Sequence, residues 1–256
     1  MPEFAEIATY REELKGLIGS NLISLETENS IRYPAIALNG KLEKIDQFGK
    51  VLFLTFSNNK KVLSLHLGMT GQLLGEKLDK GFLRAVFIFE GNKKIFFYDT
   101  RKFGYVKIVT KEFRDSSLGK GDIGSISYQN QAIHRLTMRN KAIYSLLLDQ
   151  NVLRGVGAYL AQEALFRAKI SPEKKFLNSN QARAVILALR SVVKLAIKSK
   201  GASFKDYRRF NGEKGKMQDH FNVYGRFGEP CIVCDTLLSR VSINGRNAVF
   251  CLKCQI

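Results

Sequence analysis

The chain lacks any apolar run of about 18 residues, the length that a membrane-spanning helix requires. It also begins without a basic stretch followed by a continuous apolar one, so no secretory signal is expected. We therefore expect an intracellular protein. No internal repeat or low-complexity tract occurs. With 45% hydrophobic residues in 256, the composition predicts a folded protein of one large or two to three small domains.

Acidic residues are the scarce charge, because 23 Asp and Glu stand against 41 Lys and Arg, a formal net charge of +18. This excess favours a polyanionic partner, since phosphate contacts release condensed counterions. A membrane surface is the alternative, but no segment combines a basic face with a broad apolar one. Nucleic acid is the predicted partner. Residues 198–216 form the densest basic run, which is either a mobile loop that faces phosphates or a solvated linker.

Cysteine is missing from the first 230 residues and then forms two C-x-x-C pairs with 16 residues between them. Two thiolates from each tight turn can surround one tetrahedral ion, as in four-thiolate zinc sites. Disulfides are the alternative, and they are not expected in a reducing cell. A ribbon this small would take folding free energy from the metal. The expected ligands of one structural Zn²⁺ are Cys231, Cys234, Cys251 and Cys254.

Hydrophobic periodicity divides the chain into a β-rich part and a helical part. Apolar residues at helical spacing predict a helix from Phe4 to Gly19. Residues 110–130 are polar and rich in Gly and Ser, so we expect a connection between domains there. Before them, regularly spaced apolar runs typical of an antiparallel sandwich or barrel predict strands at 51–56, 62–67, 82–89, 94–99 and 105–109. After them, amphipathic patterns predict helices at 141–149, 157–168 and 181–199.

Four separated stretches, together with the cysteine pairs, point to one family. They are MPEFAE at the start, HLGMTG at 66–71, DTRKFG at 99–104 and LLDQNVLRGVGAYLAQEALF at 147–166. In this order they resemble bacterial formamidopyrimidine-DNA glycosylases, which are relatives of endonuclease VIII, and the resemblance runs essentially end to end. It implies an α+β fold in three parts. These are an N-terminal helix with a catalytic antiparallel β-sandwich (1–115), a helix-two-turn-helix DNA-binding domain (128–222) and a zinc-finger β-hairpin (223–256).

The resemblance implies a bifunctional enzyme that removes oxidised purines such as formamidopyrimidine and 8-oxoguanine from double-stranded DNA. Trimming of Met1 would expose Pro2 as a secondary amine, and an α-amino pKa of about 7.7–8.0 leaves a useful fraction unprotonated at neutral pH. Attack on the sugar C1′ would form a Schiff base, and β,δ-elimination would then cleave the strand. The family's general acid corresponds to Glu3, its catalytic lysine to Lys50 and its second, less direct acid to Glu6. By residue type alone, the two acids are equally explained by the helix dipole.

Chemistry on a base in a duplex requires that the nucleotide be flipped out and that the vacated space be filled. The resemblance assigns this filling to Met69, Arg101 and Phe103, with Arg101 hydrogen bonded to the orphaned cytosine. Without the resemblance, Met69 and Phe103 would be interpreted as core residues. The implied phosphate contacts are His66, Gly157 and Arg246.

Three positions depart from the family pattern. Ala158 stands where an asparagine usually follows the second glycine, Tyr144 stands where a lysine is common, and Ala5 replaces a second proline. We expect these residues to weaken the grip on DNA rather than abolish the chemistry. Two alternatives stay open: an endonuclease VIII-like enzyme for oxidised pyrimidines, and a non-catalytic protein that binds damaged DNA. The resemblance further implies a monomer in the bacterial cytoplasm, associated with the nucleoid.

Overall fold

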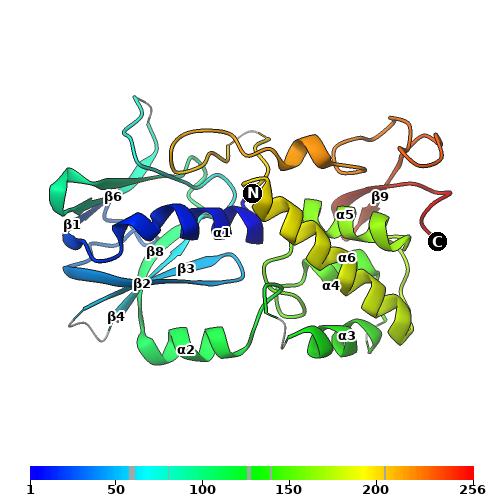
Figure 1. The fold of residues 1–256 in the computed structure, drawn as a ribbon, viewed down its shortest axis with the longest axis horizontal. Helices are drawn as coiled ribbons and strands as arrows, with labels where there is room; N and C mark the ends of the chain where they lie inside the picture. The colour runs from blue at the N-terminus through cyan, green and yellow to red at the C-terminus, as the bar shows by residue number, and fades with distance from the viewer. Residues whose placement is uncertain (58–60, 80, 126–127, 139, 205) are drawn as a thin grey trace. The chain divides into compact units, whose positions relative to one another are not determined.

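The computed structural model describes residues 1–57, 61–79, 81–125, 128–138, 140–204 and 206–256. Two compact units make up the chain (Figure 1). The first comprises Met1–Lys120 and Ser199–Lys216, and the second comprises Gly121–Lys198 and Met217–Ile256. In these described ranges, no helix combines the length and the apolar character needed to cross a membrane.

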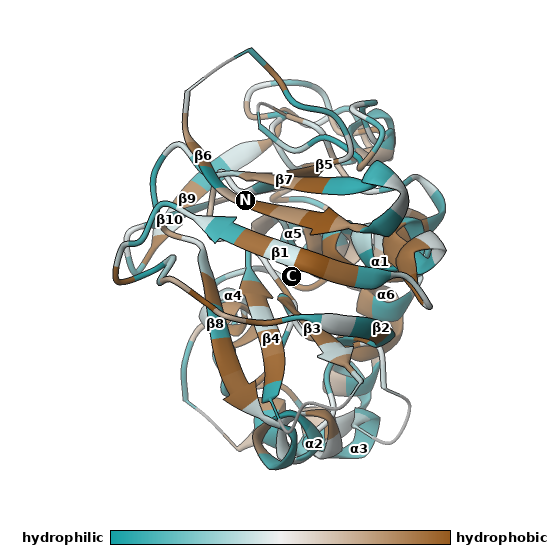
Figure 2. Ribbon diagram, turned by 90° about the vertical axis from the view of Figure 1, so that its left-hand side faces the viewer, coloured by the Kyte–Doolittle hydropathy of each residue, from teal (hydrophilic) through white to brown (hydrophobic). Residues whose placement is uncertain are grey.

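An antiparallel eight-stranded sheet, in the order β5-β7-β6-β1-β2-β3-β4-β8, is the centre of the first unit. Because β1 and β2 share only two residue pairs, the sheet separates there into two layers of four strands (Figure 2). The predicted antiparallel sandwich is therefore confirmed. The strands are β1 (Asn21–Thr27), β2 (Gly40–Phe48), β3 (Val51–Phe56), β4 (Lys61–His66), β5 (Gln72–Leu74), β6 (Leu83–Phe89), β7 (Lys94–Tyr98) and β8 (Tyr105–Thr110), with a short turn η2 (Glu90–Asn92).

The N-terminal helix packs its apolar side into the sandwich. It runs as α1 (Phe4–Glu13) and continues as η1 (Leu14–Leu17), close to the predicted range. Ile7 and Tyr10 of α1 are buried in the main core together with residues from both layers of strands. Burial of such a side chain contributes about 1.5–3 kcal/mol. This packing fixes the start of α1 relative to the ends of the strands.

Residues 110–130 are not an irregular connection throughout, as we expected from their composition. They contain α2 (Lys111–Gly119), which begins where the Thr110 hydroxyl accepts a hydrogen bond from Phe113 N at 3.1 Å. Only two of its nine side chains are large and apolar, so its periodicity was too weak to predict a helix. One of them, Leu118, packs on Phe53 and its neighbours on the outer face of the sheet.

The basic segment Ser199–Lys216 is docked on the first unit, which corrects the expectation of a mobile loop or a solvated linker. Glu13 of α1 holds it with both carboxylate oxygens. One oxygen accepts a hydrogen bond from Phe210 N at 2.9 Å, and the other pairs with Arg209 Nε at 2.7 Å. Arg209 is therefore neutralised within the protein. Lys205 lies outside the described residues.

Four helices and a β-hairpin form the described part of the second unit. The helices are α3 (Gln129–Thr137), α4 (Ile143–Leu148), α5 (Ala158–Ala168) and α6 (Ser179–Lys198), followed by the short turn η3 (Met217–His220). The last three helices confirm the predictions, whereas α3 was not predicted. The hairpin consists of β9 (Ser239–Ile243) and β10 (Arg246–Phe250). Asn244 and Gly245, with φ of 50° and 73°, form the two-residue type I′ turn between them.

Candidate active site

A pair of buried acids opens α1. Glu3 is 3% exposed and Glu6 is 1% exposed. Glu6 Oε2 accepts a hydrogen bond from Glu3 N at 2.7 Å, which is half of a capping box, and Oε1 accepts one from Ala202 N at 2.7 Å. Pro2 is buried just before them, whereas Met1 is 58% exposed. Glu6 thus fixes the backbone beside the predicted nucleophile and joins it to the segment that follows α6.

Lys50 occupies the second position of the two-residue turn between β2 and β3. Gly49 takes the first position with φ of 58°, which matches a type II′ turn. The buried Gln47 donates from Nε2 to Gly49 O and to Phe4 O, both at 2.9 Å. One side chain therefore ties the Lys50 turn to the first residue of α1, two positions after Pro2.

His66 ends β4 opposite Val51 and stacks on Tyr105 of β8, with ring centroids 5.5 Å apart. Its Nδ1 accepts a hydrogen bond from Gly68 N at 3.1 Å, so the neutral ring carries its proton on Nε2. Burial, and next the charge of Lys50, lower the pKa of His66 to about 4. At neutral pH it is an uncharged hydrogen-bond donor that is electrostatically coupled to Lys50.

Met69, Arg101 and Phe103 lie on two loops at this same end of the strands. The first loop follows β4 and the second precedes β8, and these two strands pair side by side up to His66 and Tyr105. Met69 is 39% exposed and Phe103 is 45% exposed. The exposed Arg101 places its guanidinium carbon 4.7 Å from the Phe103 ring centroid. Exposure of both apolar side chains excludes the interpretation that they are core residues.

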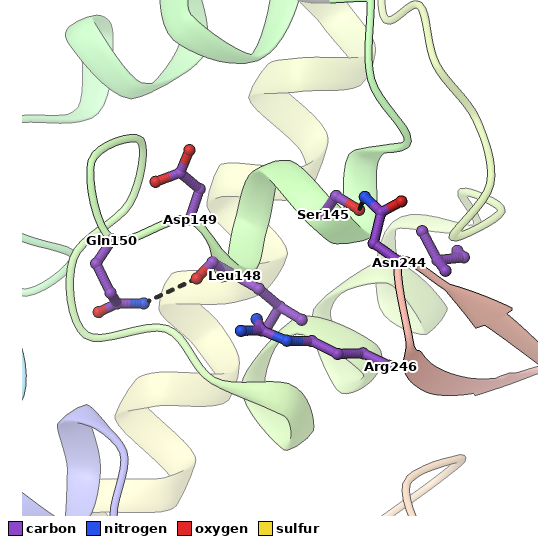
Figure 3. A pocket seen from close by; sticks show the side chains of 7 residues that line it. Ser145, Leu148, Asp149, Gln150, Asn244 and Arg246 are labelled. Atoms are coloured by element: carbon purple, nitrogen blue, oxygen red, sulfur yellow. Dashed lines mark hydrogen bonds between the residues drawn. The ribbon is translucent and has the colours of Figure 1, made fainter. Parts of the chain in front are cut away.

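In the second unit, Arg246 lines a cavity of about 460 Å³ (Figure 3). Asn244 Nδ2 donates to Ser145 Oγ at 3.0 Å, which joins the hairpin turn to α4 across this cavity. Within the described ranges, Arg246 makes no ion pair, so its charge is available to an anion. The other lining residues are Leu148, Asp149, Gln150 and Ile243.

Gln150 closes the glycine turn that precedes α5. Its Oε1 accepts a hydrogen bond from Gly155 N at 2.9 Å, and its Nε2 donates to Val156 O at 2.8 Å. Gly155 has φ of 96°, a conformation that residues with a Cβ rarely adopt. Gly157 then serves as the N-cap of α5. The turn therefore sets the start of a helix whose N-terminus attracts anions.

Tyr144 is buried and anchors the hairpin that carries Arg246. Its hydroxyl donates to Asn247 O at 3.1 Å and accepts from Gln162 Nε2 at 3.0 Å. Gln162 Oε1 in turn accepts a hydrogen bond from Val249 N at 2.9 Å. In a hairpin with a two-residue turn, alternate residues of a strand direct N–H and C=O away from the partner strand, and residues 247 and 249 hold these positions. Tyr144 and Gln162 therefore supply hydrogen-bond partners for the outward-facing backbone groups of β10.

The four cysteines form one cluster of free thiols in which all Sγ atoms lie within 4.8 Å of one another. The distances are 3.4 Å for Cys234–Cys251 and Cys234–Cys254, and 3.9 Å for Cys231–Cys254. Tetrahedral ligands at a Zn–S bond length of about 2.3 Å would be about 3.8 Å apart. The donor set and its spacing therefore fit one structural zinc ion, as predicted.

Three family profiles match the chain in succession. Residues 1–106 match the formamidopyrimidine-DNA glycosylase N-terminal domain, 125–208 match its H2TH domain, and 228–256 match a zinc finger found in FPG and IleRS. The chain belongs to the formamidopyrimidine-DNA glycosylase family. A formamidopyrimidine-DNA glycosylase of Desulfitobacterium hafniense is 33% identical over 277 residues, which cover both chains completely.

Solved structures of family members show the same fold. MutM (Fpg) from Thermus thermophilus is 32% identical, with a TM-score of 0.90 over 99% of this chain and 98% of that one. A variant of Lactococcus lactis Fpg in complex with Fapy-dG-containing DNA is 26% identical with a TM-score of 0.88. The wild-type Lactococcus protein in complex with oxidised-pyrimidine DNA is 25% identical with a TM-score of 0.87, and both complexes cover 99% of each chain.

Apart from Glu6, the residues that support the site in this family member were not predicted from the sequence. Gln47 and Asp99 are buried polar residues of the first unit, at 8% and 0% exposure. Gln162 and the fully buried Glu163 are adjacent in α5, and Glu163 accepts backbone hydrogen bonds from residues 222–224 before the zinc ribbon. Polar residues amid the apolar runs of α5 were the available signal, because polar side chains are rarely buried unless they make hydrogen bonds.

Proposed function

We propose that this family member is a bifunctional DNA glycosylase and abasic-site lyase of base excision repair, acting on oxidised purines such as formamidopyrimidine and 8-oxoguanine. The observation that carries the proposal is the support built around the chain start. Glu6 holds the backbone of Glu3, and Gln47 ties the Lys50 turn to the beginning of α1. The acid Glu3 and the amine of Lys50, held in this way beside Pro2, are the groups that a Schiff-base reaction at Pro2 requires.

In the proposed reaction, the amine of Pro2 bonds to the deoxyribose C1′ and the bond from C1′ to the damaged base breaks. Glu3 donates a proton to the ring oxygen, the ring opens, and an iminium links protein and sugar. Loss of a C2′ proton then expels the 3′ phosphate, and a second elimination expels the 5′ phosphate. Water hydrolyses the remaining iminium and restores the amine. Exposure of Met1 supports its removal by an aminopeptidase beforehand.

DNA binding is proposed to use both units. Met69, Arg101 and Phe103 would enter the duplex after base flipping, and their exposure on adjacent loops supports this role. His66 would donate from neutral Nε2 to a phosphate beside Lys50. In the second unit, phosphate would be bound by Arg246 and the turn at Gly157.

The zinc ion that Cys231, Cys234, Cys251 and Cys254 would hold is structural, because four thiolates leave no open coordination position. The ribbon packs on Phe166 of α5, and its core includes two of the cysteines themselves. Metal binding therefore stabilises the hairpin on which Arg246 stands.

Borohydride reduction tests the proposal directly. The parent protein, incubated with abasic or 8-oxoguanine duplex, should form a stable adduct whose intact mass shows a chain without Met1. The Pro2→Gly variant should trap at least roughly tenfold less, because the secondary amine is lost. Glu3→Gln is the matched control, which keeps the nucleophile and removes the acid. A parent chain that binds the duplex but never traps would instead be a damaged-DNA-binding protein without catalysis.

Oxidised pyrimidines are the second candidate substrate class. A family member at 25% identity is known in complex with oxidised-pyrimidine DNA. Comparison of kcat/KM on duplexes with 8-oxoguanine and with 5-hydroxyuracil, each opposite cytosine, separates the two classes. A higher value for 5-hydroxyuracil would replace the purine assignment while leaving the Schiff-base mechanism intact.

A further inference from the structure

Beneath the two exposed loops lies a carboxylate with no exposed surface, that of Asp99. It stands at the end of β7, at the start of the loop that carries Arg101 and Phe103. The other loop, which carries Met69, reaches it through the neighbouring Thr70. The proposed reaction leaves this buried acid without a role.

The Asp99 carboxylate accepts two hydrogen bonds on each oxygen. Oδ2 accepts from the Tyr33 hydroxyl at 2.8 Å and from Gly104 N at 2.7 Å. Oδ1 accepts from the Thr70 hydroxyl at 2.6 Å and from Arg101 N at 3.3 Å. Arg101 N also contacts the Thr70 hydroxyl, at 3.1 Å. Arg101 thus donates to the Asp99 carboxylate from its own backbone, and Thr70 and Gly104, which follow Met69 and Phe103 in the sequence, donate to it as well.

The backbones of the two loops also touch at a pair of glycines. A Cβ on Gly68 would lie 2.4 Å from Gly104 N, and Gly68 itself has φ of 60°. A Cβ on Gly104 would lie 2.9 Å from the Tyr33 hydroxyl oxygen and 3.0 Å from Asp99 Oδ2. Residues with a Cβ are therefore excluded at positions 68 and 104, where the loops meet over the carboxylate.

We propose that Asp99 is a positioning residue that holds Met69, Arg101 and Phe103 in the arrangement with which they enter DNA. This inference rests on the proposed function. A buried carboxylate is unfavourable unless its lone pairs are used, and here hydrogen bonds from both loops and from the Tyr33 hydroxyl use them. The loops are consequently ordered before DNA arrives, and binding does not have to order them.

Arg84 contacts Asp99 at its main chain and not at its carboxylate. Arg84 donates from Nε to the Asp99 main-chain oxygen at 2.8 Å, not to the carboxylate. Its Nη1 pairs with Glu28 at 2.6 Å, and Glu28 also pairs with Lys102 at 3.3 Å. The carboxylate is thus left to accept from the loops.

Asp99→Asn tests the inference, because the two side chains have the same shape and differ in one acceptor. Each oxygen of Asp99 faces one backbone N–H, from Gly104 on one side and Arg101 on the other. The hydroxyls of Tyr33 and Thr70 can rotate and accept a hydrogen bond from an asparagine NH₂ group, but a backbone N–H can only donate. Whichever way the asparagine amide turns, its NH₂ group therefore opposes one of these two amides.

The first measurement follows amide hydrogen exchange across residues 99–104 in the full-length protein. Exchange at Arg101 or Gly104 should rise at least roughly tenfold in Asp99→Asn. The second measurement compares kcat/KM for a lesion opposite cytosine and opposite adenine. The ratio should fall roughly tenfold as Arg101 loses its fixed position, while borohydride trapping on single-stranded abasic DNA, which has no opposite base, stays within about twofold of the parent.

Val62→Ala is the matched control, since it destabilises the same unit from the far end of β4 and should leave the opposite-base ratio unchanged. Tyr33→Phe removes one donor but orphans no backbone amide, so it should shift exchange in the same direction by a smaller factor. It also serves if Asp99→Asn does not fold. Unchanged exchange in the Tyr33 and Asp99 variants would overturn the inference, as would an equal loss of discrimination in Val62→Ala. A parent protein that never traps DNA would overturn the proposed function instead, and the exchange result would still decide the role of Asp99.

Discussion

Replacement of Gln162 by leucine should release the zinc hairpin from the helices of the second unit. The glutamine is 3% exposed and makes three hydrogen bonds. Two of them reach β10, at Val249 N and Asn247 O, and the third reaches the Tyr144 hydroxyl. Leucine is similar in size and makes none of them.

The expected loss of stability depends on which hydrogen bonds each partner of Gln162 keeps. Asn247 O keeps the hydrogen bond from Tyr144 when Gln162 is lost, but Val249 N loses its side-chain acceptor in a buried position. One orphaned buried donor costs about 1–3 kcal/mol. For a unit of this size, that corresponds to a fall in Tm of roughly 4–12 °C. Tyr144→Phe orphans no backbone group of β10, because Asn247 O still accepts from Gln162 Nε2. It removes only the Tyr144 acceptor of the Gln162 amide, so its cost should stay at or below about 1 kcal/mol.

Thermal unfolding in excess zinc, together with amide exchange at Val249, measures both variants. We expect Gln162→Leu to unfold at the lower temperature and to lose protection at Val249, with Tyr144→Phe close to the parent. Equal destabilisation by the two variants, or full protection of Val249 in Gln162→Leu, would refute the reasoning that the outer edge of β10 is held by this side chain.

Three other outcomes can be measured on the same protein. Because the folded state lowers the pKa of His66 to about 4, the unfolded chain takes up a proton first as pH falls below about 6.5. From pH 7 to pH 5 the parent should lose up to about 2 kcal/mol more stability than His66→Gln, and equal pH slopes in urea unfolding would contradict this. Chelation should release one zinc ion per chain and unfold the ribbon, which circular dichroism with a zinc indicator would detect; a ribbon that stays folded without metal would argue against the cluster. Arg246→Ala should lower the salt dependence of DNA binding by about 0.9 in slope, whereas Arg226→Ala, already paired with Glu229, should leave it unchanged.

Strong local patterns predicted much of the fold. The runs at 51–56 and 105–109 became β3 and β8 almost without change, because most of their residues are apolar, although β3 is a buried inner strand and β8 is a largely unburied edge strand. In contrast, β1 mixes apolar with polar residues and β2 contains four charged ones, so neither strand was predicted, although the two strands join the two layers. The helix α2 was missed for the same reason, since its contact with the sheet depends on few apolar side chains.

Among the site residues, those that face outward and the buried pair Glu3 and Glu6 were predicted, whereas other buried residues that hold the site were not. Met69, Arg101 and Arg246 stand in recognisable motifs, and the structure places them on exposed loops or at a cavity. Asp99 and Gln162 stand in the same motifs, but their importance depends on partners such as Tyr33 and Val249, which are distant in the sequence. No local pattern reports such partners.

The sequence by itself determined the zinc ligands, the order of sheet, helices and ribbon, and the family, because these depend on spacing along the chain. Only the tertiary structure decided that the segment Ser199–Lys216 belongs with α1, far from it in sequence. Composition indicated a loop of free positive charge, whereas Glu13 and Glu6 bind its backbone. Whether a charged group or a backbone amide is paired depends on a partner that folding brings close from elsewhere in the sequence.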